Sequence, residues 1–225
     1  MRRTLLITAL ALAVLNTGAE TLGMHEAVYI LKPLAILALM ALVLRTTAAS
    51  RYRTWIAAGL AASLAGDILL MLPQGLFVQG LAAFLLAHLC YIRAFASDGA
   101  GRSAPVLPAL PVFGIAGALL WYLWPSLGPM RLPVACYVAV ISTMSWQAIA
   151  RWRMLGTPHA MLAAAGSVCF LMSDSALAIR KFMAPFPGAT LVIMATYYAA
   201  QLGLALSVSA DDPSLAARGQ TLRVG

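Results

Sequence analysis

Eight apolar stretches, each close to the length that crosses a lipid bilayer, dominate this sequence. A helix needs roughly 20 apolar residues to span the hydrocarbon core. Hydrophobic residues make up 62% of the 225 positions and charged residues 10%, so lipid is the expected solvent for most of the chain. We therefore predict an all-α fold, a polytopic membrane helix bundle. The predicted spans are residues 4–19, 27–45, 54–72, 77–96, 105–124, 132–150, 161–180 and 188–209.

Short turn signals separate these spans. Gly and Pro clusters stand at Pro73-Gln74-Gly75, Asp98-Gly99-Ala100-Gly101 and Gly156-Thr157-Pro158, and again at residues 125–129 and 185–188. No linker is long enough to divide the chain, so we expect one integral membrane domain over residues 1–225 that ends in a short tail at residues 211–225. The first stretch resembles a signal peptide, but we expect it to remain as the first helix.

The distribution of Lys and Arg predicts the orientation of the bundle. The net charge is +8, and a cytoplasmic N-terminus places all but four of the 15 basic residues on the inner side. The positive-inside rule therefore predicts that both termini are cytoplasmic, in a multi-pass protein of a bacterial cytoplasmic membrane. No soluble domain or basic stripe indicates nucleic-acid binding. The four exceptions are Lys32, Arg131, Arg180 and Lys181.

Cysteine usage indicates neither a disulfide framework nor a metal site. Cys90, Cys136 and Cys169 lie within apolar runs, in no Cys-x-x-Cys or Cys/His arrangement. We interpret them as small buried hydrophobic residues. The sequence therefore predicts no metal and no cofactor.

Two carboxylic acids inside apolar spans are the main candidates for chemistry. Asp67 and Asp174 each lie about fourteen residues into a span, and both spans run outward. At about 1.5 Å rise per residue, the two acids are expected at the same depth, in the outer half of the bilayer. An ionised carboxylate there costs at least about 2.5–3.5 kcal/mol, so such residues usually face a bundle interior or a wet cavity.

Two interpretations of these acids stay open. A buried ion pair with Lys32 would be a purely structural explanation, although one lysine neutralises only one aspartate. Alternatively, two neighbouring carboxyls resist double ionisation and would share a proton. Such a pair, Asp67 and Asp174, would hold one acid and one base, as general acid–base catalysis requires.

Further polar side chains are expected in the same layer of the bundle. Ser63 lies one turn before Asp67 and is expected to hydrogen-bond it. Interhelical hydrogen bonding or interface anchoring would explain each of the others equally well. These candidate supporting residues are Lys32, His88, Tyr197, Tyr198 and Gln201, together with Lys181, which with the adjacent Arg180 could meet a lipid phosphate at the outer rim.

Five short motifs occur in order along the spans. They are Lys32-Pro33-Leu34, Ala65-Gly66-Asp67-Ile68-Leu69-Leu70, Ala87-His88-Leu89-Cys90-Tyr91, Ser173-Asp174-Ser175-Ala176-Leu177 and Tyr197-Tyr198-Ala199-Ala200-Gln201-Leu202. In order and spacing they resemble the YhhN family of membrane lysoplasmalogenases. The resemblance implies a hydrolase that cleaves the vinyl ether bond of a lysophospholipid within the bilayer. It also implies that Asp67 and Asp174 are the catalytic acid and base, without indicating which is which.

Two other functions are compatible with paired acids in a membrane. An intramembrane aspartyl protease also activates water between two aspartates, but Ser173-Asp174 lacks the expected Tyr-Asp pairing and the order of the two acids is reversed. A proton-coupled transporter would use the aspartates as proton relays. A faint similarity of the third and fourth spans to the last two is compatible with such a transporter. The sequence leaves the oligomeric state, the head-group preference and the contact between the third and seventh spans open.

Overall fold

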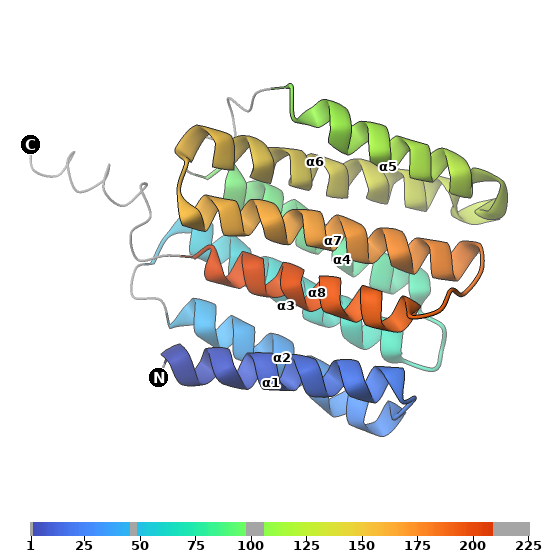
Figure 1. Ribbon diagram of the computed structural model, residues 1–225, viewed down its shortest axis with the longest axis horizontal. Coiled ribbons are helices and arrows are strands. Elements are labelled where there is room, and N and C mark those ends of the chain that lie inside the picture. Colours follow the sequence, from blue (N-terminus) through green and yellow to red (C-terminus); the bar gives the residue numbers. More distant parts are fainter. Residues whose placement is uncertain (1, 46–48, 98–105, 209–225) are drawn as a thin grey trace, which may run out of the picture.

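Eight membrane-length helices form one bundle in the computed structural model, which describes residues 2–45, 49–97 and 106–208 (Figure 1). Two short 3₁₀ segments, η2 (Trp124–Ser126) and η3 (Gly128–Met130), join α5 to α6, and the described residues contain no strand. The predicted all-α bundle of eight spans is thus confirmed. The helices are α1 (Arg2–Thr21), α2 (His25–Leu44), α3 (Arg51–Met71), α4 (Phe77–Phe95), α5 (Ala109–Leu123), α6 (Arg131–Leu155), α7 (Pro158–Phe182) and α8 (Ala189–Leu206).

Local sequence explains where several helices begin and end. Gly156 ends α6 in the left-handed conformation, with φ of 63°, which glycine adopts without steric cost. The side chain of Thr157 then accepts a hydrogen bond from the backbone N–H of Ala160 at 3.2 Å, and Pro158 occupies the first turn of α7. Ser50 caps α3 in the same way by accepting from the N–H of Arg53 at 3.1 Å. The turn predicted at residues 156–158 is therefore present.

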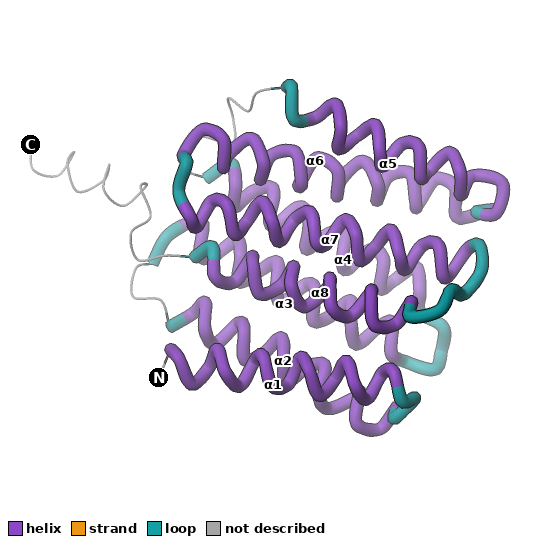
Figure 2. Tube along the Cα trace, in the orientation of Figure 1, coloured by secondary structure: helices purple, strands orange, loops and turns teal. Residues whose placement is uncertain are grey.

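The described connections between consecutive helices are short, so neighbouring helices run antiparallel (Figure 2). α1 begins and α8 ends at the same end of the bundle (Figure 1). Residues 98–101 and the tail at residues 211–225, for which we expected a turn and a cytoplasmic segment, lie outside the described residues. The assignment of this end to the cytoplasm remains a prediction.

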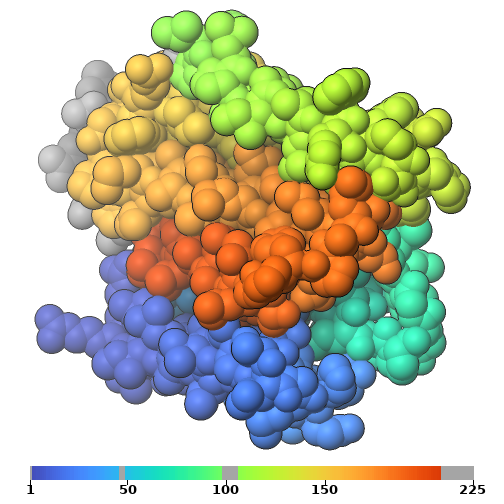
Figure 3. Space-filling view, turned by 45° about the vertical axis from the view of Figure 1, so that its right-hand side comes forward, coloured from blue at the N-terminus to red at the C-terminus, as the bar shows by residue number. Residues whose placement is uncertain are grey.

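α8 is the most buried helix of the bundle, whereas α1 and α5 are the least buried. α8 packs extensively on α7, and it also contacts α1, α2 and α3. α3 packs mainly on α4, and α4 packs on α6. The space-filling view shows the α1–α2 pair and α5 at opposite sides of the molecule, with α7 and α8 between them (Figure 3). α8 thus contacts both α3 and α7, the two helices that carry the acids.

The α7–α8 contact depends on two glycines that let the backbones approach closely. A Cβ on Gly203 would lie 2.8 Å from the carbonyl oxygen of Leu162 and 2.9 Å from the Cα of Gly166. A Cβ on Gly166 would lie 2.9 Å from the carbonyl oxygen of Ala200. The obstructing atoms belong to the backbone and cannot rotate away, so small residues are required here, as at many helix contacts in membranes.

We predict that Gly166→Ala and Gly203→Ala each lower the free energy of unfolding in detergent by about 1–3 kcal/mol, the usual cost of overpacking. Thermal unfolding of the purified protein would measure the loss. Gly117→Ala in α5 is the matched control, because no atom lies within 4 Å of its added Cβ. The control should be neutral or slightly stabilising. Equal effects of all three substitutions would contradict the close-contact explanation.

Candidate active site

A cavity of about 440 Å³ opens into the end of the bundle opposite the start of α1. Side chains from all eight helices line it, and those of Asp67 and Asp174 are both among them. Much of the lining is apolar and comes from α5, α6 and α7. The cavity therefore brings both predicted acids to one apolar space, although α3 and α7 are not close neighbours.

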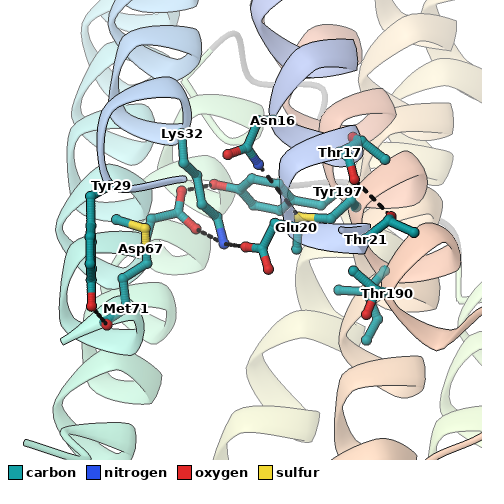
Figure 4. A network of polar contacts seen from close by, with 12 residues as sticks. Asn16, Thr17, Glu20, Thr21, Tyr29, Lys32, Asp67, Met71, Thr190 and Tyr197 are labelled. Atoms are coloured by element: carbon teal, nitrogen blue, oxygen red, sulfur yellow. Dashed lines mark hydrogen bonds and ion pairs between the residues drawn. The ribbon is translucent and has the colours of Figure 1, made fainter. Parts of the chain in front are cut away.

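Asp67 is held by two donors inside the bundle. Its side chain belongs to α3 and the residue is only 2% exposed. Lys32 on α2 places its Nζ 3.4 Å from Asp67 Oδ1, and the Tyr197 hydroxyl on α8 donates a hydrogen bond to Oδ2 (Figure 4). The buried ion pair considered from the sequence is therefore present. Both carboxylate oxygens are engaged, as expected for an ionised acid away from water.

Lys32 is shared with a second carboxylate that the sequence interpretation did not single out. Glu20, near the end of α1, places Oε1 3.5 Å from Lys32 Nζ and also lines the cavity (Figure 4). The two residues face each other because the tight turn at residues 22–24 folds α2 back along α1. One cation thus lies between two carboxylates at the wall of the cavity.

A chain of hydrogen bonds supports Tyr197 from behind. Gln201 Nε2 donates to the Tyr197 hydroxyl at 2.9 Å, and Gln201 Oε1 accepts from the Tyr91 hydroxyl at 3.2 Å. The Ser63 hydroxyl lies 3.4 Å from that of Tyr91. The expectation that Ser63 bonds Asp67 is therefore wrong, because Tyr91 lies across from the serine. Gln201, one turn from Tyr197 as expected, fixes the orientation of the phenol.

Asp174 has a different set of partners. Tyr137 on α6 donates to Asp174 Oδ2 at 2.5 Å. His88 Nε2 lies 2.7 Å from the Tyr137 hydroxyl and 3.6 Å from Asp174 Oδ2. His88 is fully buried and does not line the cavity, whereas Tyr137 does. His88 therefore supports the acid from behind Tyr137, a residue absent from the sequence-based set.

The two acids are engaged separately. In the described part of the chain, no hydrogen bond joins Asp67 to Asp174. Aromatic rings pack between their networks, because the Phe170 ring lies 4.7 Å from that of His88 and 5.8 Å from that of Tyr197. Of the two interpretations left open by the sequence, the described contacts favour the ion pair and give the shared proton no direct hydrogen bond. The two carboxyls meet only through the space of the cavity.

The remaining candidates fall into two groups. Lys181 and Arg180, at the end of α7, both line the cavity. Tyr198 is buried, and its ring packs edge-on against that of Tyr197 at 5.3 Å. Unlike Tyr197, it is not part of the cavity wall that the described residues form. The structure thus brings Lys181 to the site and leaves Tyr198 as a packing neighbour.

Similarity to known proteins agrees with this constellation of residues. The model of the YhhN family matches residues 27–208, a range that includes both aspartates, Lys32 and Tyr197. The chain belongs to the YhhN family. No solved structure matches this chain.

Curated relatives of this YhhN protein carry the name lysoplasmalogenase. Lysoplasmalogenase TMEM86B of Sus scrofa is 36% identical over 192 residues, which cover 83% of this chain and 76% of that protein. The lysoplasmalogenase of Mycobacterium bovis is 36% identical over 210 residues, covering 87% and 75%. Lysoplasmalogenase TMEM86A of Homo sapiens is 38% identical over 167 residues, covering 71% and 68%.

We predict that Lys32→Met destabilises this YhhN protein by about 3–5 kcal/mol, because removing one partner of a buried ion pair leaves an uncompensated charge. The double variant Lys32→Met/Asp67→Asn should recover much of the loss. Chemical unfolding in detergent would measure both. Lys181→Met is the matched control and should change stability by no more than about 0.5 kcal/mol. Strictly additive losses from Lys32→Met and Asp67→Asn would contradict the pairing.

Proposed function

We propose that this protein is a lysoplasmalogenase, which hydrolyses the vinyl ether bond of lysoplasmalogens within the membrane. The observation that carries the proposal is the placement of two differently held aspartates on one apolar cavity. Membership of a family whose curated relatives are named lysoplasmalogenases supports the substrate class. The products are a fatty aldehyde and a glycerophospho-base. The positive-inside distribution of charge favours a cytoplasmic-membrane protein with both termini inside.

The reaction requires an acid and a base on either side of the vinyl ether. An acid first protonates the alkene carbon distal to the ether oxygen, and the electron pair of the double bond forms the new C–H bond. The resulting oxocarbenium ion is attacked by water, which loses a proton to give a hemiacetal. The hemiacetal collapses to the aldehyde and the glycerol hydroxyl. Two carboxyls divide comparable work in glycoside hydrolysis.

The contacts of the two aspartates favour one division of labour. Lys32 and Tyr197 engage both oxygens of Asp67, so Asp67 suits the role of the carboxylate that first stabilises the cation and then accepts the proton of water. Tyr137 engages only Oδ2 of Asp174. Oδ1 of Asp174 has no hydrogen-bond partner among the described residues, and it can therefore carry the proton to the substrate. We assign Asp174 as the acid and Asp67 as the base.

The apolar part of the cavity suits the alkenyl chain. Leu119, Leu123, Val134 and Val138 line the side formed by α5 and α6, opposite the polar groups on α1, α2 and α3. A chain bound along these residues would place the vinyl ether, at its polar end, near the aspartates. Apolar surroundings also strengthen the attraction between the Asp67 carboxylate and the developing cation.

We predict that Asp67→Asn and Asp174→Asn each reduce aldehyde release by about 10²- to 10⁴-fold, the usual contribution of general acid–base catalysis. The measurement is turnover of lysoplasmenylethanolamine by the purified, folded protein. Glu26→Gln is the matched acid-to-amide control, because Glu26 is exposed in the first turn of α2 and does not line the cavity. Normal turnover by either aspartate variant would refute the two-carboxylate mechanism.

We also predict that hydrolysis in D₂O yields a fatty aldehyde with one deuterium at carbon 2. The reason is that the acid delivers its proton to this carbon before water attacks. Immediate reduction to the alcohol prevents later exchange, and mass spectrometry then counts the deuterium atoms. Authentic unlabelled aldehyde, carried through the same D₂O incubation and reduction, controls for exchange. Aldehyde that the enzyme releases without deuterium would rule out carbon protonation.

A further inference from the structure

Two adjacent cations stand at the rim of the cavity without an acidic partner. Arg180 and Lys181 occupy the last turn of α7 and both line the cavity. Arg180 Nη1 donates to the Thr190 hydroxyl at 3.1 Å, and Lys181 Nζ lies 5.0 Å from the centre of the Phe77 ring. Neither cation forms an ion pair with any acid that the structure describes. The charge of this pair is therefore free to attract an anion into the rim.

The carboxylates of the cavity already have partners among the described residues. Lys32 lies between Glu20 and Asp67, and Asp174 has Tyr137 and His88 beside it. An anionic ligand group would consequently meet carboxylates beside Lys32 and Tyr137, and two cations without an acidic partner at the end of α7. Electrostatic attraction by Arg180 and Lys181 therefore favours one orientation of a bound amphiphile, in which its anionic group lies at the end of α7.

Spacing along α7 agrees with the geometry of a lysophospholipid. Lys181 follows Asp174 by seven residues, which is two turns on the same helix face and about 10 Å along the axis. Side chains on a helix lean toward its N-terminus, so the Lys181 ammonium is directed back along this face. In a lysoplasmalogen, seven covalent bonds separate the reacting vinyl carbon from phosphorus. An extended chain spans about 8 Å over that number of bonds.

We propose that Arg180 and Lys181 form a phosphate subsite that binds the phosphodiester of the substrate head group and holds the vinyl ether next to Asp174. This inference rests on the proposed lysoplasmalogenase function. Guanidinium and ammonium groups donate charge-assisted hydrogen bonds to phosphate oxygens. The subsite makes the enzyme selective for alkenyl lipids with a phosphate at this distance, and it disfavours alkenylglycerols, which end in a neutral hydroxyl.

The test compares two substrates with the same alkenyl chain in neutral detergent micelles. One is 1-alkenyl-glycerophosphoethanolamine and the other is the phosphate-free 1-alkenylglycerol. Lys181→Met and Arg180→Met should each raise KM for the phospholipid roughly tenfold, as expected for a lost hydrogen bond to a charged group. KM for the alkenylglycerol and kcat for both substrates should stay within about twofold of wild type.

Two further variants separate recognition of phosphate from general damage. Lys181→Arg keeps the charge and should retain a wild-type KM for the phospholipid. Arg131→Met removes an exposed cation that contacts Trp124 at the same end of the bundle and does not line the cavity. It should leave KM for both substrates unchanged. Equal increases of KM for both substrates in the Met variants of α7, or no increase for either, would overturn the phosphate subsite.

Bilayer head groups are the alternative source of phosphate at this rim. Repeating the assay in phosphatidylcholine vesicles with and without phosphatidylglycerol distinguishes the two. If the cations bind bulk lipid, their removal will affect both substrates equally and the effect will change with vesicle charge, which would also overturn the proposal. If wild-type protein releases aldehyde from neither substrate, the lysoplasmalogenase function itself fails. If wild-type protein cleaves both substrates and the substitutions at Arg180 and Lys181 do not change KM, the phosphate subsite is refuted and the lysoplasmalogenase function is not.

Discussion

The cost of holding a carboxylate away from water governs the organisation of this bundle. Asp67 is buried in α3, and it is compatible with the interior only because α2 supplies Lys32 and α8 supplies Tyr197. Tyr197 is in turn oriented by Gln201 and Tyr91. Three helices are thus fixed relative to one another by the requirements of a single side chain. An apolar residue at this position would remove the cost, but it would also remove the charge that the proposed mechanism uses to stabilise its cationic intermediate.

The cavity combines two half-sites of different construction. One half presents Asp67 with both oxygens bonded, and the other presents Asp174 with one oxygen bonded to Tyr137. The ring of Phe170 packs between His88 of one network and Tyr197 of the other. Different surroundings can make one carboxyl the acid and the other the base, although the two groups are chemically identical. In a symmetric pair that shares one proton, only a bound substrate could distinguish them. The helices that carry the acids need not touch, because the cavity between them brings both side chains to one space.

Much of this architecture could be predicted from the sequence. Span length and apolar composition were sufficient to predict the eight helices. The position of each residue along its span was sufficient to predict that Asp67, Lys32 and Tyr197 lie in the same layer. Tyr137 was missed because a lone tyrosine in an apolar span is usually a packing residue. Glu20 was missed because it lies at the end of a span, where acids are ordinary. The partner of Ser63 depended on helix rotation, which weakly amphipathic membrane helices do not encode in their sequence.

The position of the cavity, at the end of the bundle away from the start of α1, has a consequence for the fate of the products. A fatty aldehyde is soluble in hydrocarbon, and a glycerophospho-base is soluble in water. A site at the boundary of the two phases lets each product diffuse into its own medium as soon as the hemiacetal collapses. The recombination of the two then requires both to return to the same interface. Separation of the products into two phases would thus disfavour the reverse reaction, and no conformational change of the protein would be needed for it.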